Sequence, residues 1–284
     1  MPSINDNVRF VLFAIFIAGC GGAPDVGVYP EIIAGTSLIQ DIASDLTDAA
    51  VTAHILLPSG ACPSQFDLRA ADITRLQQAR LVILHPWQLD LANIRRVIEA
   101  AGTPESRQRI VDVPGNWMLP DTQAAATRAL AELLGNEMPE KRPLITRRLE
   151  ARLSAIEDAA TTARDQLESA WPTPPVVLCN AMQRPFAVWA GLEAIAAFGR
   201  PEDWSVADTE RLVRLGREHK VVLVIDNLQS GGARMSETLA RDIGAAHVVL
   251  SNFPGGFPDT QHWESAFNEN IHRLLTALGS EALP

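Results

Sequence analysis

The sequence predicts an α/β protein with two α/β lobes, each built on a parallel-type sheet, joined by one long backbone helix. Apolar strand-like runs alternate with helix-like segments in both halves, the pattern that βαβ units produce. A long helical segment separates the two halves. Of the 284 residues, 47% are hydrophobic and 20% are charged, which suits a large core and excludes a disordered chain. The net charge of −10, without any Lys/Arg cluster, argues against nucleic-acid binding.

The first half contains four short runs rich in Val, Ile and Leu, separated by stretches in which apolar residues recur at helical spacing. We expect strands at residues 31–34, 51–57, 80–85 and 109–113. We expect helices at residues 37–46, 67–79 and 89–101. Because a helical crossover joins successive strands, these strands should lie parallel in one sheet.

The middle of the chain predicts one linking helix over residues 139–171. Leu144, Leu149, Leu153 and Ile156 follow one another at steps of three to five residues, and prolines begin at Pro172. The helix would exceed the usual length of about 8–20 residues. It divides the chain into an N-terminal lobe at 20–138 and a C-terminal lobe at 172–284.

The second half repeats the alternation of the first. We expect strands at residues 176–179, 221–225 and 247–250. We expect helices at residues 186–196, 206–219, 235–243 and 260–278.

The N-terminus has the features of an export signal. Arg9 precedes an apolar run at 10–17, which is too short to span a bilayer, where about 20 residues are needed. Such a run fits the hydrophobic region of a cleaved signal peptide at 1–19. The tetrad that ends at Cys20 resembles the bacterial lipobox, which implies lipidation of that cysteine. We therefore expect an exported protein, lipid-anchored to the membrane and facing the periplasm or the cell exterior.

Several local motifs together resemble one protein family. They are Gly35-Thr-Ser with Asp41, the loop at 57–67, Asn116-Trp-Met-Leu-Pro120, and Glu237-Thr-Leu-Ala240 ahead of Gly244-Ala245. In order and spacing they are similar to the metal-type (zinc/manganese) solute-binding lipoproteins of ABC importers. This resemblance implies a fold like that of class III periplasmic binding proteins. It also implies a monomer that captures a transition metal ion or metal complex between its lobes and delivers it to an ABC permease in the cytoplasmic membrane.

The chain departs from that family at the metal ligands. The family usually holds its ion with three histidines and one carboxylate, two from each lobe. The corresponding segments here are Ser64-Gln65, Gly115-Asn116, 180–183 and Ser251-Asn252, none of which carries a standard ligand at the matching position. The resemblance therefore implies the fold and the transport role, with a transition metal as transported ligand and no catalytic cofactor, but not the usual zinc chemistry.

Amide and aromatic residues follow the predicted strands. Ligands of open α/β sheets bind outside the carboxyl ends of the strands, so these residues are our candidates for ligand contact. His85 is the principal one, because it lies where a buried strand meets Pro86. The candidates are Gln65, His85, Gln88, Asn116, Trp117, Asn180, Gln183, Gln229 and Asn252.

Three ligand chemistries remain open. A soft metal site could use Cys62, His85 and Met182, with Met118 and Cys179 as further ligands of the same kind. A hydrated or chelated metal, or a small polar organic ligand, could be held by amides and stacked on Trp87 and Trp117. A hard or borderline cation could be bound by amide oxygens, Asp67 and His85. Cys62 and Cys179 could instead form a disulfide in an oxidising compartment.

The sequence gives no sign of an enzyme. It contains no Gly-x-Ser-x-Gly, no phosphate-binding loop and no dinucleotide fingerprint. The alternatives to an importer component are a non-transport surface lipoprotein, such as an adhesin or a metal chaperone, and a binder of a small polar organic ligand.

Overall fold

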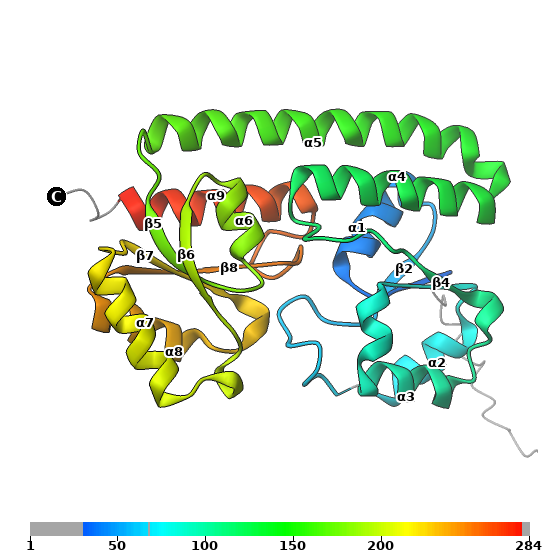
Figure 1. Ribbon diagram of the computed structural model, residues 1–284. Coiled ribbons are helices and arrows are strands. Elements are labelled where there is room, and N and C mark those ends of the chain that lie inside the picture. Colours follow the sequence, from blue (N-terminus) through cyan, green and yellow to red (C-terminus); the bar gives the residue numbers. More distant parts are fainter. Residues whose placement is uncertain (1–30, 68, 280–284) are drawn as a thin grey trace, which may run out of the picture.

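The computed structural model describes residues 31–67 and 69–279, so the predicted signal peptide and Cys20 lie outside the described residues. Two α/β lobes lie side by side beneath the long helix α5 (Arg142–Ala170) (Figure 1). At 1.5 Å per residue, the 29 residues of α5 extend over about 43 Å. The prediction of two lobes joined by one long helix is confirmed. No helix among the described residues is long and apolar enough to cross a membrane.

Each lobe contains a four-stranded parallel sheet. The N-terminal sheet has the order β2-β1-β3-β4 and the C-terminal sheet the order β6-β5-β7-β8. The strands are β1 (Ile32–Ala34), β2 (Ala53–Ile55), β3 (Leu81–Leu84), β4 (Gln108–Ile110), β5 (Val176–Asn180), β6 (Glu193–Phe198), β7 (Leu223–Asn227) and β8 (Ala246–Leu250). In each sheet the chain first steps to one side of its first strand and then crosses to the other, which opens a crevice at the carboxyl ends of the strands.

Helices cover both sheets and fill the space between them and α5. The N-terminal lobe has α1 (Ser37–Leu46), α2 (Ala70–Gln78), α3 (Ala92–Ala101) and α4 (Pro120–Glu137). The C-terminal lobe has α6 (Arg184–Trp189), α7 (Val206–Glu218), α8 (Ala233–Ile243) and α9 (Trp263–Gly279). The sequence did not predict α4, which packs along α5.

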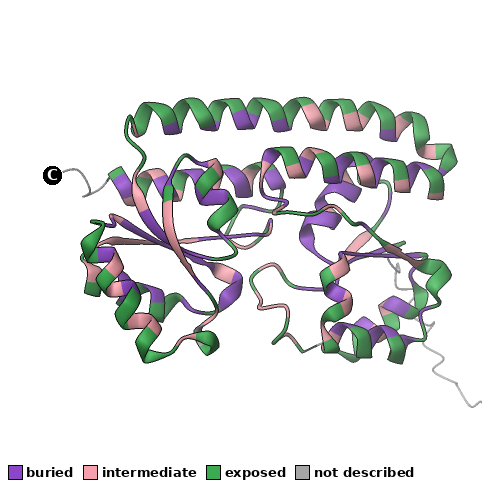
Figure 2. Cartoon of the chain, viewed as in Figure 1, coloured by how far each residue is buried: buried purple, intermediate pink, exposed green. Residues whose placement is uncertain are grey.

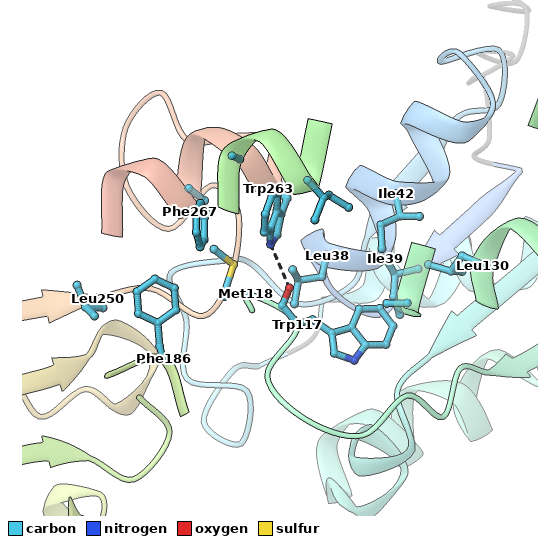
Figure 3. Close-up of a cluster of buried hydrophobic side chains, with 14 of the residues drawn as sticks. Leu38, Ile39, Ile42, Trp117, Met118, Leu130, Phe186, Leu250, Trp263 and Phe267 are labelled. Carbon is cyan, nitrogen blue, oxygen red and sulfur yellow. Dashed lines mark hydrogen bonds between the residues drawn. The ribbon is translucent and has the colours of Figure 1, made fainter. Parts of the chain in front are cut away.

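One hydrophobic core runs through both lobes. Leu38 of α1, Leu130 of α4, Phe186 of α6 and Phe267 of α9 all belong to the same buried cluster (Figure 3). The indole Nε1 of Trp263 donates to the carbonyl oxygen of Trp117 at 3.1 Å and so joins the lobes inside this core. Figure 2 shows that the outer face of α5 is exposed and its inner positions are buried. The lobes are therefore connected by packed side chains as well as by α5.

The helix predicted at 186–196 is wrong in its second part. Helix α6 ends at Trp189, Gly191 adopts a left-handed φ of +80°, and β6 begins at Glu193. The alanines of this segment favour a helix by intrinsic propensity. Pairing with β5, which forms from Val176↔Glu193 onwards, overrides that preference.

Candidate functional site

A cavity of about 520 Å³ lies between the lobes at the carboxyl ends of the two sheets. Its N-terminal wall comes from the residues that follow β3 and β4, and its C-terminal wall from those that follow β5, β7 and β8. This is the position at which open α/β sheets bind ligands. A second cavity of about 480 Å³ lies between α1, α5 and the start of α9.

Three rings form an aromatic wall on the N-terminal side, which we define as His85, Trp87 and Trp117. The His85 ring lies nearly parallel to Trp87 at a centroid distance of 5.5 Å and meets Trp117 edge-on at 4.3 Å. Trp117 is anchored by its Nε1, which donates to the carbonyl oxygen of Val113 at 2.8 Å. Trp87 is 38% exposed, whereas the other two rings are buried. Trp87 is thus the ring most accessible to a solute in the cavity.

His85 is held in place on two sides. Its Nε2 lies 2.8 Å from the Thr36 hydroxyl, and its backbone N–H donates to the Gln88 side-chain oxygen at 3.0 Å. Burial lowers the pKa of His85 from 6.5 to about 3, because the charged imidazolium loses its hydration. The imidazole is therefore neutral at pH 7.

The neutral His85 predicts a pH effect on stability. Since the folded-state pKa of about 3 lies below the unfolded value of 6.5, the unfolded chain binds the extra proton between these values. The contribution of His85 to the free energy of unfolding is therefore fully present above pH 6.5. Below that pH it falls by up to about 1.4 kcal/mol per pH unit. Urea unfolding of wild type and His85→Gln between about pH 6 and 4 measures it: the wild-type free energy of unfolding should fall more steeply. Equal slopes would contradict this prediction.

Four side chains form what we call the amide cluster: Asn116 of the N-terminal lobe and Gln183, Asn227 and Asn252 of the C-terminal lobe. Asn116 Nδ2 donates across the lobes to Asn252 Oδ1 at 3.0 Å. Gln183 Nε2 donates to the same oxygen at 3.1 Å and to Asn227 Oδ1 at 3.0 Å. Of the four segments that correspond to the family's metal-ligand segments, the second, third and fourth thus meet here through amide side chains.

Most oxygens of the amide cluster are already engaged. Asn252 Oδ1 accepts two hydrogen bonds, and Asn116 Oδ1 accepts one from the Met118 backbone N–H at 2.8 Å. Among the buried side-chain atoms of the described residues, Gln183 Oε1 has no partner. Among all the residues that the structure describes, no group of three or more His, Cys, Asp or Glu is arranged to hold a metal ion. The donor set is therefore neutral and largely occupied.

Further hydrogen bonds join the lobes around the cavity. Gln229 Nε2 donates to the carbonyl oxygen of Ser59 at 2.7 Å, and Arg200 Nη1 donates to Ser64 Oγ at 3.0 Å. Both acceptors lie in the loop at 58–67. Ser37 Oγ donates to the carbonyl oxygen of Pro254 at 2.8 Å. The 58–67 loop therefore contacts the C-terminal lobe.

The structure brings seven of the residues singled out in the sequence to the cavity surface. They are His85, Trp87, Asn116, Trp117, Met182, Gln229 and Asn252.

Other predicted residues lie elsewhere. Gln88 is fully buried and donates to the Gly35 carbonyl oxygen at 3.0 Å, so it stabilises the turn at His85 and does not line the cavity. Asn180 lies beneath the cavity, where its Nδ2 contacts Asp226 and Ser230. Gln183 is fully buried within the amide cluster, and Gln65 is exposed and outside the cavity lining.

The structure does not gather the residues predicted for a soft metal site. Cys62 lies in the 58–67 loop with its Sγ 3.4 Å from Ser64 Oγ, outside the cavity lining. Cys179 is buried within β5, and Met118 is buried in the shared core. Both described cysteines are free thiols. Asp67, proposed for a hard cation, is exposed and also outside the lining.

Sequence reasoning missed several lining residues, among them Asn227, Ser230 and Arg200. Asn227 and Ser230 follow the strand predicted at 221–225, so the rule that selected Gln229 could have selected them too. Arg200 follows β6, the strand mistaken for a helix, and its place at a strand end was therefore hidden.

The family model described as "ZnuA: Zinc-uptake complex component A periplasmic" matches residues 32–277, which is most of the described chain. The chain belongs to this family. The predicted resemblance to metal-type solute-binding proteins is thereby confirmed. No curated protein matched the chain.

Solved structures share this fold over nearly their whole length. A metal-free mutant of a periplasmic metal binding protein from Candidatus Liberibacter asiaticus is 14% identical, with a TM-score of 0.73, and the match covers 87% of this chain and 98% of that one. The Mn-bound protein from the same organism is also 14% identical, with a TM-score of 0.71 and the same coverage. A crystal structure of ZnuA is 17% identical, with a TM-score of 0.70, covering 87% of this chain and 98% of that one. At these identities the likeness establishes the two-lobe fold.

Proposed function

We propose that this chain is the extracytoplasmic solute-binding component of an ABC importer and that its cargo is a transition metal carried as a complex. Family membership supports the transport role. The observation that favours a complex over a bare ion is the amide cluster: three of its members, Asn116, Gln183 and Asn252, lie in segments where the family resemblance implies histidines and a carboxylate. We assign the chain no catalytic activity and no catalytic cofactor.

The chemistry of the cleft is a poor match for a bare divalent ion. Zinc sites are built from thiolate, imidazole and carboxylate ligands. Here the amide nitrogens donate hydrogen bonds, and the oxygen of Asn252 already accepts two of them. His85 is the single imidazole of the lining, and its Nε2 lies at the Thr36 hydroxyl. A metal that arrives with its own ligands needs none of these groups to coordinate it.

The composition of the purified protein tests the cargo. We expect protein from its native compartment to carry one equivalent of metal by elemental analysis and one additional organic mass by native mass spectrometry. Stoichiometric metal without any organic mass would contradict the proposal of a complex. An organic mass without metal would instead support the second candidate, a small polar organic solute, which the neutral amides of the cavity also favour.

We further propose that the protein is exported, anchored by lipid on Cys20, and acts as a monomer that delivers its cargo to a permease in the cytoplasmic membrane. Two or more acyl chains hold a protein stably at a membrane, whereas one chain gives only marginal binding. Replacing Cys20 by Ser should therefore move the protein from the membrane fraction to the soluble extracytoplasmic fraction. Retention of Cys20→Ser in the membrane fraction, detected by immunoblotting after carbonate washing, would contradict the lipid anchor.

A further inference from the structure

We infer that the inter-lobe cavity selects a solute without net charge, which presents a flat ring to Trp87 and hydrogen-bonding edges to the amide cluster. This inference rests on the proposed function and narrows it. For a metal cargo, the solute is an electrically neutral chelate with a planar, ring-bearing organic ligand.

The charges around the cavity support neutrality. His85, Asp112 and Arg200 are its only titratable lining residues among those the structure describes. His85 is uncharged at pH 7, and the other two carry opposite charges. Asp112 is exposed, and Arg200 already donates to Ser64. Apart from Asp112 and Arg200, no charged side chain of the described residues lines the cavity, so a solute with net charge would lose its hydration there with little compensation, which is strongly unfavourable.

The two walls recognise different faces of a solute. The aromatic wall presents Trp87, which is 38% exposed, and aromatic rings attract other flat rings in offset or edge-on arrangements. On the other side, Asn252 Nδ2 has no hydrogen-bond partner among the described residues, so its two N–H groups remain for a solute acceptor. The orientation of the Asn252 amide is fixed, because its Oδ1 accepts from Asn116 Nδ2 at 3.0 Å and from Gln183 Nε2 at 3.1 Å. A ring with carbonyl or carboxylate oxygens at its edge satisfies both walls.

The cavity is larger than a single hydrated ion requires. One water molecule occupies about 30 Å³ of liquid, so an ion with six waters needs on the order of 200 Å³. The cavity of about 520 Å³ lies instead within the range of roughly 300–1,000 Å³ that is typical of small-molecule sites.

Three zinc probes of different charge test the inference on the purified chain. They are hydrated Zn²⁺, the neutral complex of zinc with two histidinate ions, and the doubly negative zinc–EDTA complex. We expect the neutral complex to bind one-to-one and at least about 100-fold more tightly than either charged probe, measured by calorimetry and by tryptophan fluorescence. Tighter binding of a charged probe, equal binding of all three, or no saturable binding of any would overturn the inference.

Two variants test whether the aromatic wall contributes to binding of the neutral complex. Trp87→Ala should weaken binding of the neutral complex at least about 10-fold, which is the loss expected for one stacked ring. Trp204→Phe is the matched control, because Trp204 packs on Phe198 outside the cavity lining. Thermal unfolding of both variants shows whether either is misfolded. Unchanged binding by a folded Trp87→Ala variant would also overturn the inference.

The same titration separates failure of the inference from failure of the proposed function. If hydrated Zn²⁺ alone binds tightly, metal transport stands and the selection of a neutral solute fails. If histidine without metal binds as tightly as its zinc complex, selection of a neutral solute stands and the metal cargo fails.

Discussion

Changing Asn116→His, Gln183→His and Asn252→Asp together is expected to create a site for bare zinc. The hydrogen bonds that join these amides are 3.0 and 3.1 Å long. Ligand atoms about 2.0–2.2 Å from a tetrahedral zinc ion lie roughly 3.3–3.5 Å apart, so a small displacement brings three new ligands around one ion. Water completes the coordination, as in zinc sites with three protein ligands.

The expected gain in zinc affinity is large, because the substitutions introduce imidazole and carboxylate ligands together with a negative charge. The variant should bind Zn²⁺ one-to-one, at least about 100-fold more tightly than wild type, since imidazole and carboxylate replace neutral amides. Competition with a zinc-sensitive dye measures this affinity.

A matched control carries the same substitution types at three exposed amides on separate helices: Gln77→His, Asn136→His and Asn268→Asp. This control should bind zinc no better than wild type. If wild type itself binds Zn²⁺ as tightly as the cleft variant, the amides do not exclude the bare ion and our account of the cleft is contradicted.

The positions of Asn116, Gln229 and Asn252 could be predicted from the sequence because they depend on a local rule. A polar residue that follows a buried strand lies near the carboxyl edge of the sheet, and all three line the cavity as expected. The rule does not say whether such a residue contacts a ligand or only stabilises the local fold through hydrogen bonds. Gln88 illustrates the second case, since both ends of its amide bond to neighbouring backbone groups.

The remaining differences come from long-range contacts. The strand β6 could not be predicted from an alanine-rich segment, because its conformation depends on pairing with β5. The shared core could not be predicted either. Periodicity shows that Trp263 and Phe186 are apolar positions on helices, but not that both belong to one cluster with Leu38 of the other lobe. Predicting separate lobes therefore missed the packing between them.

Removing Arg152 is expected to destabilise the protein strongly. Its side chain, 10% exposed, extends from α5 and donates to Asp41 Oδ2 at 2.6 Å and to Asp45 Oδ2 at 3.1 Å. Asp41, in α1, is 1% exposed and also accepts the backbone N–H of Trp263 at 3.2 Å. One carboxylate therefore joins the N-terminal lobe, the long helix and the C-terminal lobe. Arg152→Ala removes the guanidinium from this buried carboxylate and leaves it with His262 Nδ1 at 3.0 Å and the Trp263 N–H.

The expected loss is about 3–5 kcal/mol in the free energy of unfolding, the range for breaking a buried ion pair from one side. Urea unfolding measures it as a lower transition midpoint. Arg80→Ala is the matched control, because Arg80 forms an exposed pair with Glu31 at 4.0 Å and should change stability by less than about 1 kcal/mol.

A double-mutant cycle separates the ion pair from simple loss of packing. Asp41→Asn removes the buried charge while an amide oxygen can still accept the Trp263 N–H. Arg152→Met with Asp41→Asn should therefore be less destabilised than the sum of the two single variants, by about 1–3 kcal/mol of coupling. Strict additivity would mean that Arg152 acts through the packing of its methylene groups on α1. In that case the shared core, and not the buried charge, would be what fixes the two lobes against α5.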